Sequence, residues 1–194
     1  MKKIFLFIII FSSISFAQVI DVYPENYYSW GVGLDGYNIT RVGQSFTASS
    51  GIELKSAKFY LLKVGSPSGN IYAKLYTHTG SYGYSSTDYG ELSASDPVPA
   101  NSISSTTRQL ITFSFPTPYT LTNGTHYVIG LEWSNIDGSA SISVGTDDSF
   151  PTHSGNECYV SEGVRYSTQY SDLIFYVSNE AVGTTFIPII TFIE

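Results

Sequence analysis

The sequence predicts an all-β fold, a two-sheet antiparallel sandwich of jelly-roll-like form. Helical signals are nearly absent: no long stretch repeats apolar residues at the three-and-four spacing of a helix, and the single methionine starts the chain. Short segments of alternating apolar and polar residues dominate instead, and many such segments without crossover helices favour two stacked sheets. An immunoglobulin-like sandwich is the alternative, but a chain with one cysteine lacks the cysteine pair typical of that fold.

Seven segments have the composition and alternation of strands. In the segment 70–78, Ile71, Ala73 and Leu75 fall on one face of the expected strand. Tyr72, Lys74 and Tyr76 fall on the other face. A period of two is what a half-buried antiparallel strand requires. The seven segments are 44–48, 58–64, 70–78, 109–115, 126–133, 139–144 and 173–177.

Turn signals separate these segments. The run Gly-Ser-Pro-Ser-Gly at 65–69 offers the fixed φ of proline and the positive φ open to glycine, so we expect a hairpin there. Similar breaks occur at 122–125 and 135–138, each between apolar runs.

Residues 80–105 form a polar stretch too irregular for a strand, so we expect a long loop, a common place for function on a rigid sandwich. The chain has 16 tyrosines, and three of them fall in this loop. Aromatic rings offer flat surfaces on which sugar rings or partner surfaces stack, although tyrosine is also common in sandwich strands. The candidate ligand-binding residues are Tyr82, Tyr84, Asp88 and Tyr89, with the tyrosines stacking and Asp88 hydrogen-bonding.

The C-terminal segment is apolar on both faces of an expected strand. Pro188 cannot donate to a sheet ladder, which places this strand at an edge or a bend. Such a strand can complete the sheet of a neighbouring copy, and pairing within its own sandwich is the simpler alternative. The candidate assembly residues are Phe186, Ile187, Ile189, Ile190, Phe192 and Ile193.

The N-terminus has the pattern of an export leader. Lys2 and Lys3 precede an apolar run, and small residues up to Ala17 precede an expected cleavage point at Gln18. A membrane anchor is the alternative, but the run is shorter than the about 20 residues that cross a bilayer. We therefore expect a secreted or cell-surface protein with no membrane span in the mature chain. Its parts are a signal peptide at 1–17, an N-terminal segment with the first strand at 18–42 and the β-sandwich at 43–194, the last two forming one globular domain at 18–194.

Charge and cysteine content narrow the classes of partner. The formal net charge is −7, and removal of the two leader lysines makes the mature chain more acidic still, which excludes nucleic acid as an expected partner. Cys158 is the only cysteine, so no internal disulfide forms. We expect Cys158 to be a small buried apolar residue, with an intermolecular bridge as the alternative.

Catalytic and metal-binding motifs do not occur, so we expect neither an enzyme nor a cofactor. The Gly-x-Ser-x-Gly elbow and the Glu-x-Asp-x-x-Glu pattern are missing, and the three histidines are isolated in sequence. A site assembled from distant strands stays open. Glu132 is an unusually placed carboxylate, which a solvent-facing position explains. Asp147 and Asp148 could offer oxygens to a structural calcium ion, and a plain Asx turn is the simpler interpretation.

Several segments together resemble the choice-of-anchor R type of exported β-sandwich domain. They include Gly-Gln-Ser-Phe-Thr at 43–47, Lys-Val-Gly-Ser-Pro-Ser-Gly-Asn-Ile at 63–71 and Ala-Lys-Leu-Tyr at 73–76, and the likeness covers roughly 43–177. The resemblance implies a surface or secreted module held by a C-terminal anchor, and related sandwiches occur in viral fibre proteins. The segment 186–194 departs from that pattern, because it is too short and too interrupted to span a membrane.

The sequence thus predicts a secreted, non-catalytic module that binds a glycan or another surface polymer. The alternative is a structural or assembly protein, such as a surface filament, an adhesin or a virion fibre component, that uses the apolar C-terminal strand for subunit contacts and forms a homo-oligomer. A third hypothesis is a hydrolase with a site built from scattered residues, whose turnover would depend on Glu132.

Overall fold

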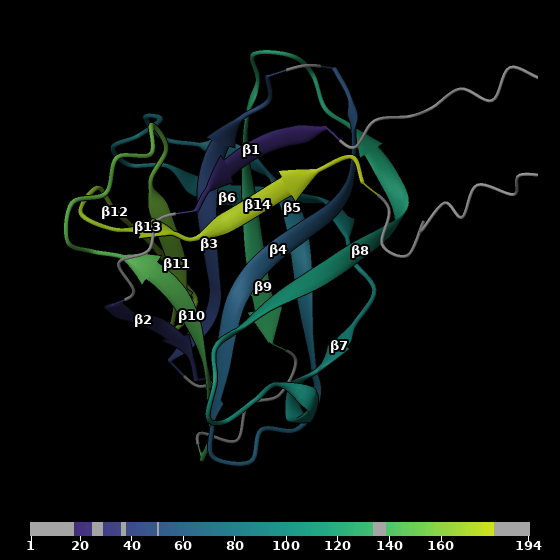
Figure 1. The fold of residues 1–194 in the computed structure, drawn as a ribbon. Helices are drawn as coiled ribbons and strands as arrows, with labels where there is room; N and C mark the ends of the chain where they lie inside the picture. Colours follow the sequence, from purple (N-terminus) through teal and green to yellow (C-terminus); the bar gives the residue numbers. More distant parts are fainter. Residues whose placement is uncertain (1–17, 25–28, 36–37, 50, 134–138, 181–194) are drawn as a thin grey trace, which may run out of the picture.

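The predicted all-β, two-sheet antiparallel fold is confirmed by the structure (Figure 1). The computed structural model describes residues 18–24, 29–35, 38–49, 51–133 and 139–180. This part of the chain forms fourteen strands and one short 3₁₀ helix, Ala100–Ser102. None of its helical structure has the length and hydropathy that crossing a bilayer demands.

Eight strands form the frame of the fold: β2 (Ser29–Leu34), β3 (Ile39–Thr47), β4 (Glu53–Val64), β5 (Asn70–Thr79), β6 (Thr87–Ala94), β8 (Gln109–Thr120), β9 (His126–Trp133) and β10 (Ser141–Asp147). They pair as one long antiparallel hairpin whose turn joins β5 to β6. Moving outward from that turn, β4 pairs with β8, β3 with β9 and β2 with β10. The hairpin is wrapped into sheet A, in the order β2-β10-β4-β8, and sheet B, in the order β3-β9-β5-β6. These are the strand orders of a jelly roll.

Six shorter strands extend the sheets: β1 (Val19–Tyr23), β7 (Val98–Pro99), β11 (Glu157–Ser161), β12 (Val164–Thr168), β13 (Asp172–Leu173) and β14 (Phe175–Ser178). In sheet A, β14 pairs with β4, β1 pairs with β14, and β13 pairs with β10. In sheet B, β11 pairs with β3, β12 with β11, and β7 with β5. The first and last described strands therefore lie side by side, across sheet A in Figure 1.

The apolar core lies between the two sheets and is rich in phenylalanine. Phe59 and Phe113, on neighbouring strands of sheet A, meet edge to face with ring centroids 6.2 Å apart. Phe46 of sheet B meets Phe175 of sheet A at 6.5 Å, which joins the two layers. All four side chains are fully buried. Burial of one such ring stabilises a fold by about 1.5–3 kcal/mol, so these contacts hold the sandwich closed.

Most of the predicted strands are confirmed. The segment 126–133 coincides with β9, and each of the other six overlaps an observed strand. Ile71 and its alternate neighbours up to Leu75 are buried in the core, as the alternation predicts. Three expectations are wrong. The turn at 65–69 does not close a hairpin, because it joins β4 of sheet A to β5 of sheet B, and the break at 122–125 likewise joins β8 of sheet A to β9 of sheet B. The stretch 80–105 is not one long loop, because it contains β6 and β7, and Tyr76 on the opposite face of β5 is buried rather than exposed.

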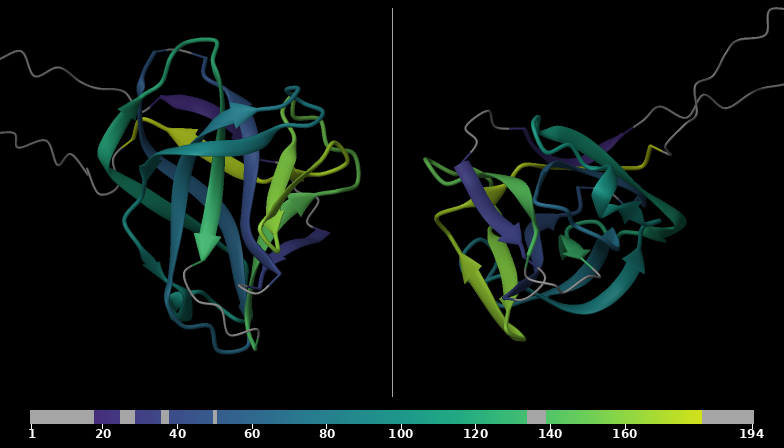
Figure 2. Two further views of the ribbon diagram at one scale, coloured as in Figure 1. Left: turned by 180° about the vertical axis from the view of Figure 1, so that it is seen from behind. Right: turned by 90° about the horizontal axis from the view of Figure 1, so that it is seen from below.

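Tyr76 is buried because sheet B curls. Its edge strands β6 and β12 come into contact, and Figure 2 (left) shows β6 passing in front of β9. The space enclosed by the curled sheet holds a second small cluster of Tyr76, Val128 and Cys158. The guanidinium carbon of Arg41 lies 4.5 Å from the centroid of the Tyr76 ring, a cation–π contact. Cys158 is a free, buried thiol, as predicted.

Asp88 on β6 closes this enclosed space. Its side chain is 2% exposed and pairs with Arg41 on β3 and, at 3.6 Å, with Arg165 Nε on β12. A carboxylate removed from water is tolerated only when partners compensate its charge. The two ion pairs therefore tie β6 to β3 and to β12 across the curled sheet.

We expect Asp88→Asn to lower the free energy of unfolding by about 3 kcal/mol, because Arg41 and Arg165 lose their buried partner. Glu91→Gln is the matched control: it breaks a pair with Lys74 at 3.0 Å in which the Glu91 side chain is 47% exposed, and should cost under about 1 kcal/mol. Urea denaturation of both variants measures the difference. Equal losses would show that the Asp88 pairs do not hold the curl.

Two predictions lie outside the described residues. They are the export leader at 1–17 and the assembly strand from Phe186 to Ile193. Leader cleavage and strand addition therefore stay predictions.

Candidate functional site

The four predicted ligand-binding residues are divided between two elements. Tyr82 and Tyr84 lie in the turn between β5 and β6, whereas Asp88 and Tyr89 lie on β6. Tyr84 and Tyr89 are exposed at 66% and 72%. Asp88 is enclosed between its two arginines, and because neighbouring strand residues point to opposite sides, it faces away from Tyr89. Ligand binding by Tyr84 and Tyr89 stays a prediction, whereas Asp88 already has cationic partners.

Tyr82 packs against the sandwich. Its ring stacks on His126 with centroids 3.9 Å apart and an interplanar angle of 7°, and its hydroxyl lies 3.1 Å from Ser154 Oγ. His78 lies edge-on to the same histidine at 5.5 Å, and burial together with His126 lowers the pKa of His78. Gly83 has a φ of 73°, and a Cβ there would lie 2.5 Å from the Ser154 carbonyl oxygen. The β5–β6 turn is therefore fixed against the segment that precedes β11.

A pocket of about 460 Å³ lies between the segment that follows β10 and the segment that follows β12. Residues 148–152 line one side, and Gln169 and Tyr170 line the other. Both segments are at the left of Figure 1. Phe150 and Tyr170 are exposed at 85% and 72%, so each presents an aromatic ring to solvent beside a carboxylate and an amide. Apolar surface with a few polar groups is typical of a ligand pocket.

Hydrogen bonds hold the segment 148–156 in place although it has no regular secondary structure. Asp147 at the end of β10 accepts the N–H and the hydroxyl of Ser149 at 2.9 and 2.8 Å, which is the Asx turn predicted for this position. The Tyr23 hydroxyl accepts the N–H of Thr152 at 3.0 Å and donates to Asp147 at 2.8 Å. Phe150 therefore stands between two anchored positions, and the pocket wall is ordered before any ligand arrives.

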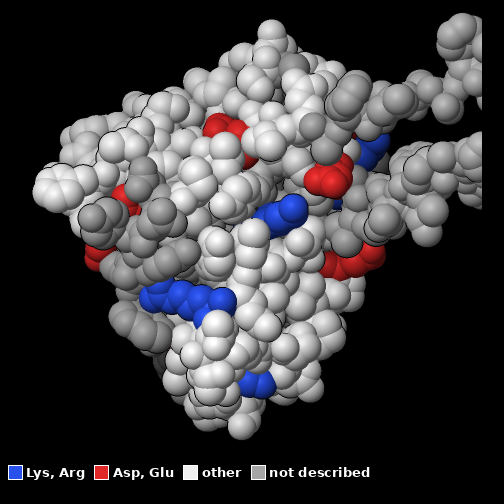
Figure 3. Space-filling model, in the orientation of Figure 1, with Lys and Arg blue, Asp and Glu red and all other residues white. Residues whose placement is uncertain are grey.

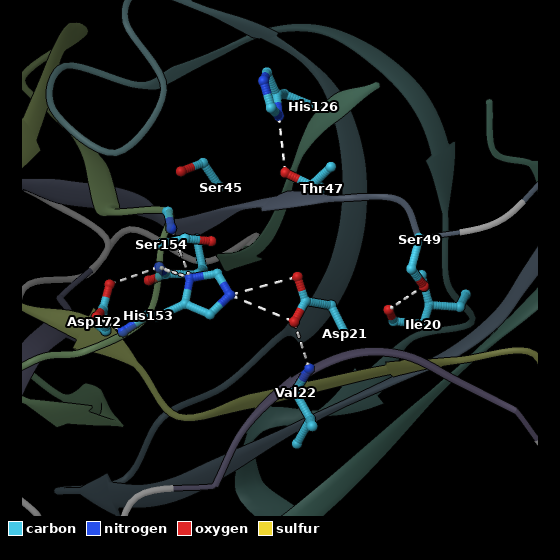
Figure 4. A network of polar contacts seen from close by, with 12 residues as sticks. Ile20, Asp21, Val22, Ser45, Thr47, Ser49, His126, His153, Ser154 and Asp172 are labelled. Carbon is cyan, nitrogen blue, oxygen red and sulfur yellow. Dashed lines mark hydrogen bonds and ion pairs between the residues drawn. The ribbon is translucent and has the colours of Figure 1, made fainter. Parts of the chain in front are cut away.

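His153 is a third anchor and joins three strands (Figure 4). The backbone N–H of His153 donates to Asp172 Oδ2 at 3.1 Å, and Gln44 Nε2 donates to Asp172 Oδ1 at 2.7 Å. Because Gly155 N–H donates to His153 Nδ1 at 3.0 Å, the proton of the neutral ring is on Nε2, which lies 3.4 Å from both carboxylate oxygens of Asp21. The loop is thus bound to β1, β3 and β13 through one side chain and its backbone.

Buried carboxylates gather next to this loop. Asp147 and Asp172 are register partners on β10 and β13, and both are 2% exposed. Glu157 at the start of β11 is fully buried, and its Oε1 has no hydrogen-bond partner among the described residues. Burial raises the pKa of Glu157 to about 7, and the nearby charges of Asp172 and Asp148 add to the effect. Carboxyl groups are therefore concentrated beside the pocket, and Glu157 is largely protonated below neutral pH.

Glu132 lies apart from these groups, on the face of β9 that Val128 shares and that turns toward the space enclosed by sheet B, and its side chain is 30% exposed. It accepts hydrogen bonds from Arg41 Nη2 at 2.9 Å and the Tyr76 hydroxyl at 3.1 Å, and it pairs with Lys74 at 3.2 Å. Burial raises the pKa of Glu132, but Lys74 and Arg41 outweigh that effect and leave the pKa below its ordinary value. An ionised, paired carboxylate is not poised to donate a proton as a glycosidase acid does.

Metal binding has little support in the part of the chain that the structure describes. No group of three or more His, Cys, Asp or Glu side chains there has an arrangement that could hold an ion. Asp147 uses its oxygens for Ser149 and Tyr23 instead.

The pocket residues Phe150, Gln169 and Tyr170 were not identifiable as a site from the sequence. The only local signal is an aromatic residue beside Pro151, directly after the Asp147-Asp148 turn. Tyr170 and Phe150 are 20 positions apart, and only the pairing of β11 with β12 returns the chain to the same place.

Charged side chains are few and separate on the face of the molecule seen in Figure 3. A continuous basic surface, which a phosphate backbone needs, is missing from that face.

The class that the fold and the pocket define is a jelly-roll protein with a preformed aromatic surface pocket. Comparison with known proteins found no matching family model, no matching curated protein and no matching solved structure. The resemblance to choice-of-anchor R domains therefore stays a prediction.

Stability should fall as pH rises through the titration of Glu157. Its folded pKa of about 7 lies above the ordinary 4.5, so its stabilising contribution is complete below pH 4.5 and is lost by neutral pH, a change of about 3 kcal/mol. We expect Glu157→Gln, which mimics the protonated acid, to flatten this part of the profile and to exceed the wild type in stability above neutral pH.

Thermal or urea unfolding between acid and weakly alkaline pH tests this expectation. Glu53→Gln is the control, because the Glu53 side chain is 50% exposed and its replacement should leave the shape of the profile unchanged. A Glu157→Gln profile parallel to that of the wild type would contradict the prediction.

Proposed function

We propose that the protein is an exported, non-catalytic module that binds a glycan or another surface polymer at the pocket between residues 148–152 and Tyr170. The observation that carries the proposal is a pair of exposed aromatic rings, Phe150 and Tyr170, on the two sides of one pocket. Leaving two large apolar rings in water gains nothing for folding. A polymer with apolar ring faces would cover them.

The chemistry of the pocket suits a carbohydrate. Aromatic faces stack on the apolar faces of sugar rings, while Asp148 and Gln169 supply hydrogen-bond acceptors and donors for hydroxyl groups. The hollow of about 460 Å³ is largely open to solvent, which suits contact with one face of an extended polymer rather than enclosure of a small molecule. The anchors at Asp147, Tyr23 and His153 order the loop in advance, which reduces the entropy lost on binding.

A binding role suits the pocket better than hydrolysis. Glycoside cleavage needs two carboxyl groups on either side of the scissile bond, and Asp148 is the one acidic residue that lines this pocket. Asp147 and Asp172 are nearby but buried and hydrogen-bonded. The proposal therefore assigns no turnover to the protein.

Polysaccharide binding should depend on Phe150 and Tyr170. We expect Phe150→Ala and Tyr170→Ala each to weaken binding of a recognised polymer about tenfold, through loss of a stacking face. A glycan array followed by affinity electrophoresis measures the effect. Both residues are solvent-exposed, so the variants should keep the melting temperature of the wild type.

Tyr84→Ala and Tyr89→Ala are the matched controls, because these rings are similarly exposed but lie on the β5–β6 side of the molecule. Loss of binding in these controls with no loss in Phe150→Ala would move the site to the tyrosines of the β5–β6 turn and β6. Absence of binding to every polymer would remove the proposed function.

Export is the second part of the proposal. Cleavage before Gln18 would leave every described strand intact, because β1 begins at Val19 and the backbone of Gln18 bonds to Asn179. We expect a secreted product whose intact mass corresponds to a chain that starts at Gln18. A product that retains residues 1–17 in the cell envelope would contradict this expectation.

A further inference from the structure

We propose that the pocket prefers a polymer carrying protonated amines, for which a glucosamine polymer with free amino groups is the simplest ligand class. The inference rests on the proposed binding function and adds the charge of the ligand to it. It comes from the distribution of carboxylates and cations around the pocket.

Asp148 supplies negative charge directly to the pocket. It lines the cavity, is exposed, and forms no ion pair with another described residue. Its hydrogen-bonding capacity is likewise unused by the described part of the chain, in contrast to its neighbour Asp147, which holds Ser149 and Tyr23. A ligand ammonium would give this carboxylate a partner and three N–H donors.

Further negative charge lies close to Asp148. Asp147 is the preceding residue and is 2% exposed. Burial raises the pKa of Asp147, but hydrogen bonds from Ser149 and Tyr23 outweigh this effect and leave the pKa below its ordinary value, so this carboxylate is ionised at the pH of the test described below. Removal from water makes the field of such groups reach further than that of surface carboxylates. The field in the pocket therefore favours cations and opposes acidic sugars.

No cation of the described chain neutralises this field from within the pocket, since the lining contains no lysine, arginine or histidine. His153 is the nearest basic residue in sequence to the 148–152 wall, and it is engaged with Asp21 and Asp172. Arg165 on β12, five positions before Tyr170, is directed to Asp88 instead.

The aromatic rings act in the same direction. An ammonium group over the face of Phe150 or Tyr170 gains a cation–π contact in addition to the stacking of the sugar ring. An N-acetylated sugar keeps the stacking and loses both the cation–π contact and the pairing with Asp148. Charge selectivity is therefore separable from polymer binding in one experiment.

The test compares three soluble polymers against the purified protein below about pH 6, where primary amines are protonated. The polymers are glucosamine oligosaccharides with free amines, their N-acetylated counterparts and polygalacturonate. We expect the amine form to bind about tenfold more tightly than the acetylated form, polygalacturonate to bind least, and the preference to shrink at high salt. Isothermal titration calorimetry measures all three.

Asp148→Asn should remove the preference for the amine form and retain binding of the acetylated form. Asp96→Asn is the matched control, because Asp96 is an exposed carboxylate near β7 rather than in the pocket, and its loss changes the net charge equally. Asp148 has no partner in the described fold, so the variant should keep the wild-type melting temperature.

The outcomes separate the two proposals. Equal binding of the amine and acetylated forms, or a preference that survives Asp148→Asn, would overturn the charge preference and leave polymer binding standing. An equal loss in Asp96→Asn would assign the preference to net charge and would also overturn it. Failure of all three polymers, together with the wider glycan array, would remove the binding function itself.

Discussion

The antiparallel pairing of strands around the β5–β6 turn is the constraint from which the rest of the structure follows. It matches β4 with β8, β3 with β9 and β2 with β10, so the chain changes sheets at almost every connection. The crossing from β10 in sheet A to β11 in sheet B is the segment 148–156. Its backbone has no ladder to join, so its polar groups need side-chain partners, and Asp147, Tyr23 and His153 provide them. The pocket wall is a consequence of that crossing.

Alternation of apolar and polar residues was sufficient to predict the class of fold. Strands such as β9 and β5 were recognisable because one face packs in the core, and their turns carry glycine, proline or asparagine. β6 was not recognisable, because its buried residue is the carboxylate Asp88 rather than an apolar side chain. The burial of Tyr76 was not predicted for a related reason. Only the curl of sheet B creates the second interior that holds Tyr76, and the alternation of apolar and polar residues along a strand does not reveal how far its sheet curls.

The candidate site was less accessible to prediction than the fold. Tyrosine density drew attention to the β5–β6 turn, where Tyr82 turns out to pack on His126. Phe150 and Tyr170 belong to different connections, and their proximity depends on the register of β11 with β12 and of β13 with β10. Burial of Glu157 depends on the same register. When two loops that are distant in sequence form a pocket together, neither loop alone has a sequence pattern from which the pocket can be predicted.

The closure of sheet B also bears on whether folded copies of the protein can pair through their sheet edges. An open sheet edge exposes unsatisfied N–H and C=O groups that can template pairing with another chain. Here the edges β6 and β12 lie against each other, and the inward-pointing charge of Asp88 fits only one alignment of β6. A slip of one residue would turn that carboxylate outward, so Arg165 would lose its contact with Asp88 and Arg41 would keep only Glu132. The ion pairs that close sheet B thus also bring its two edge strands together, which makes each edge less available to another chain.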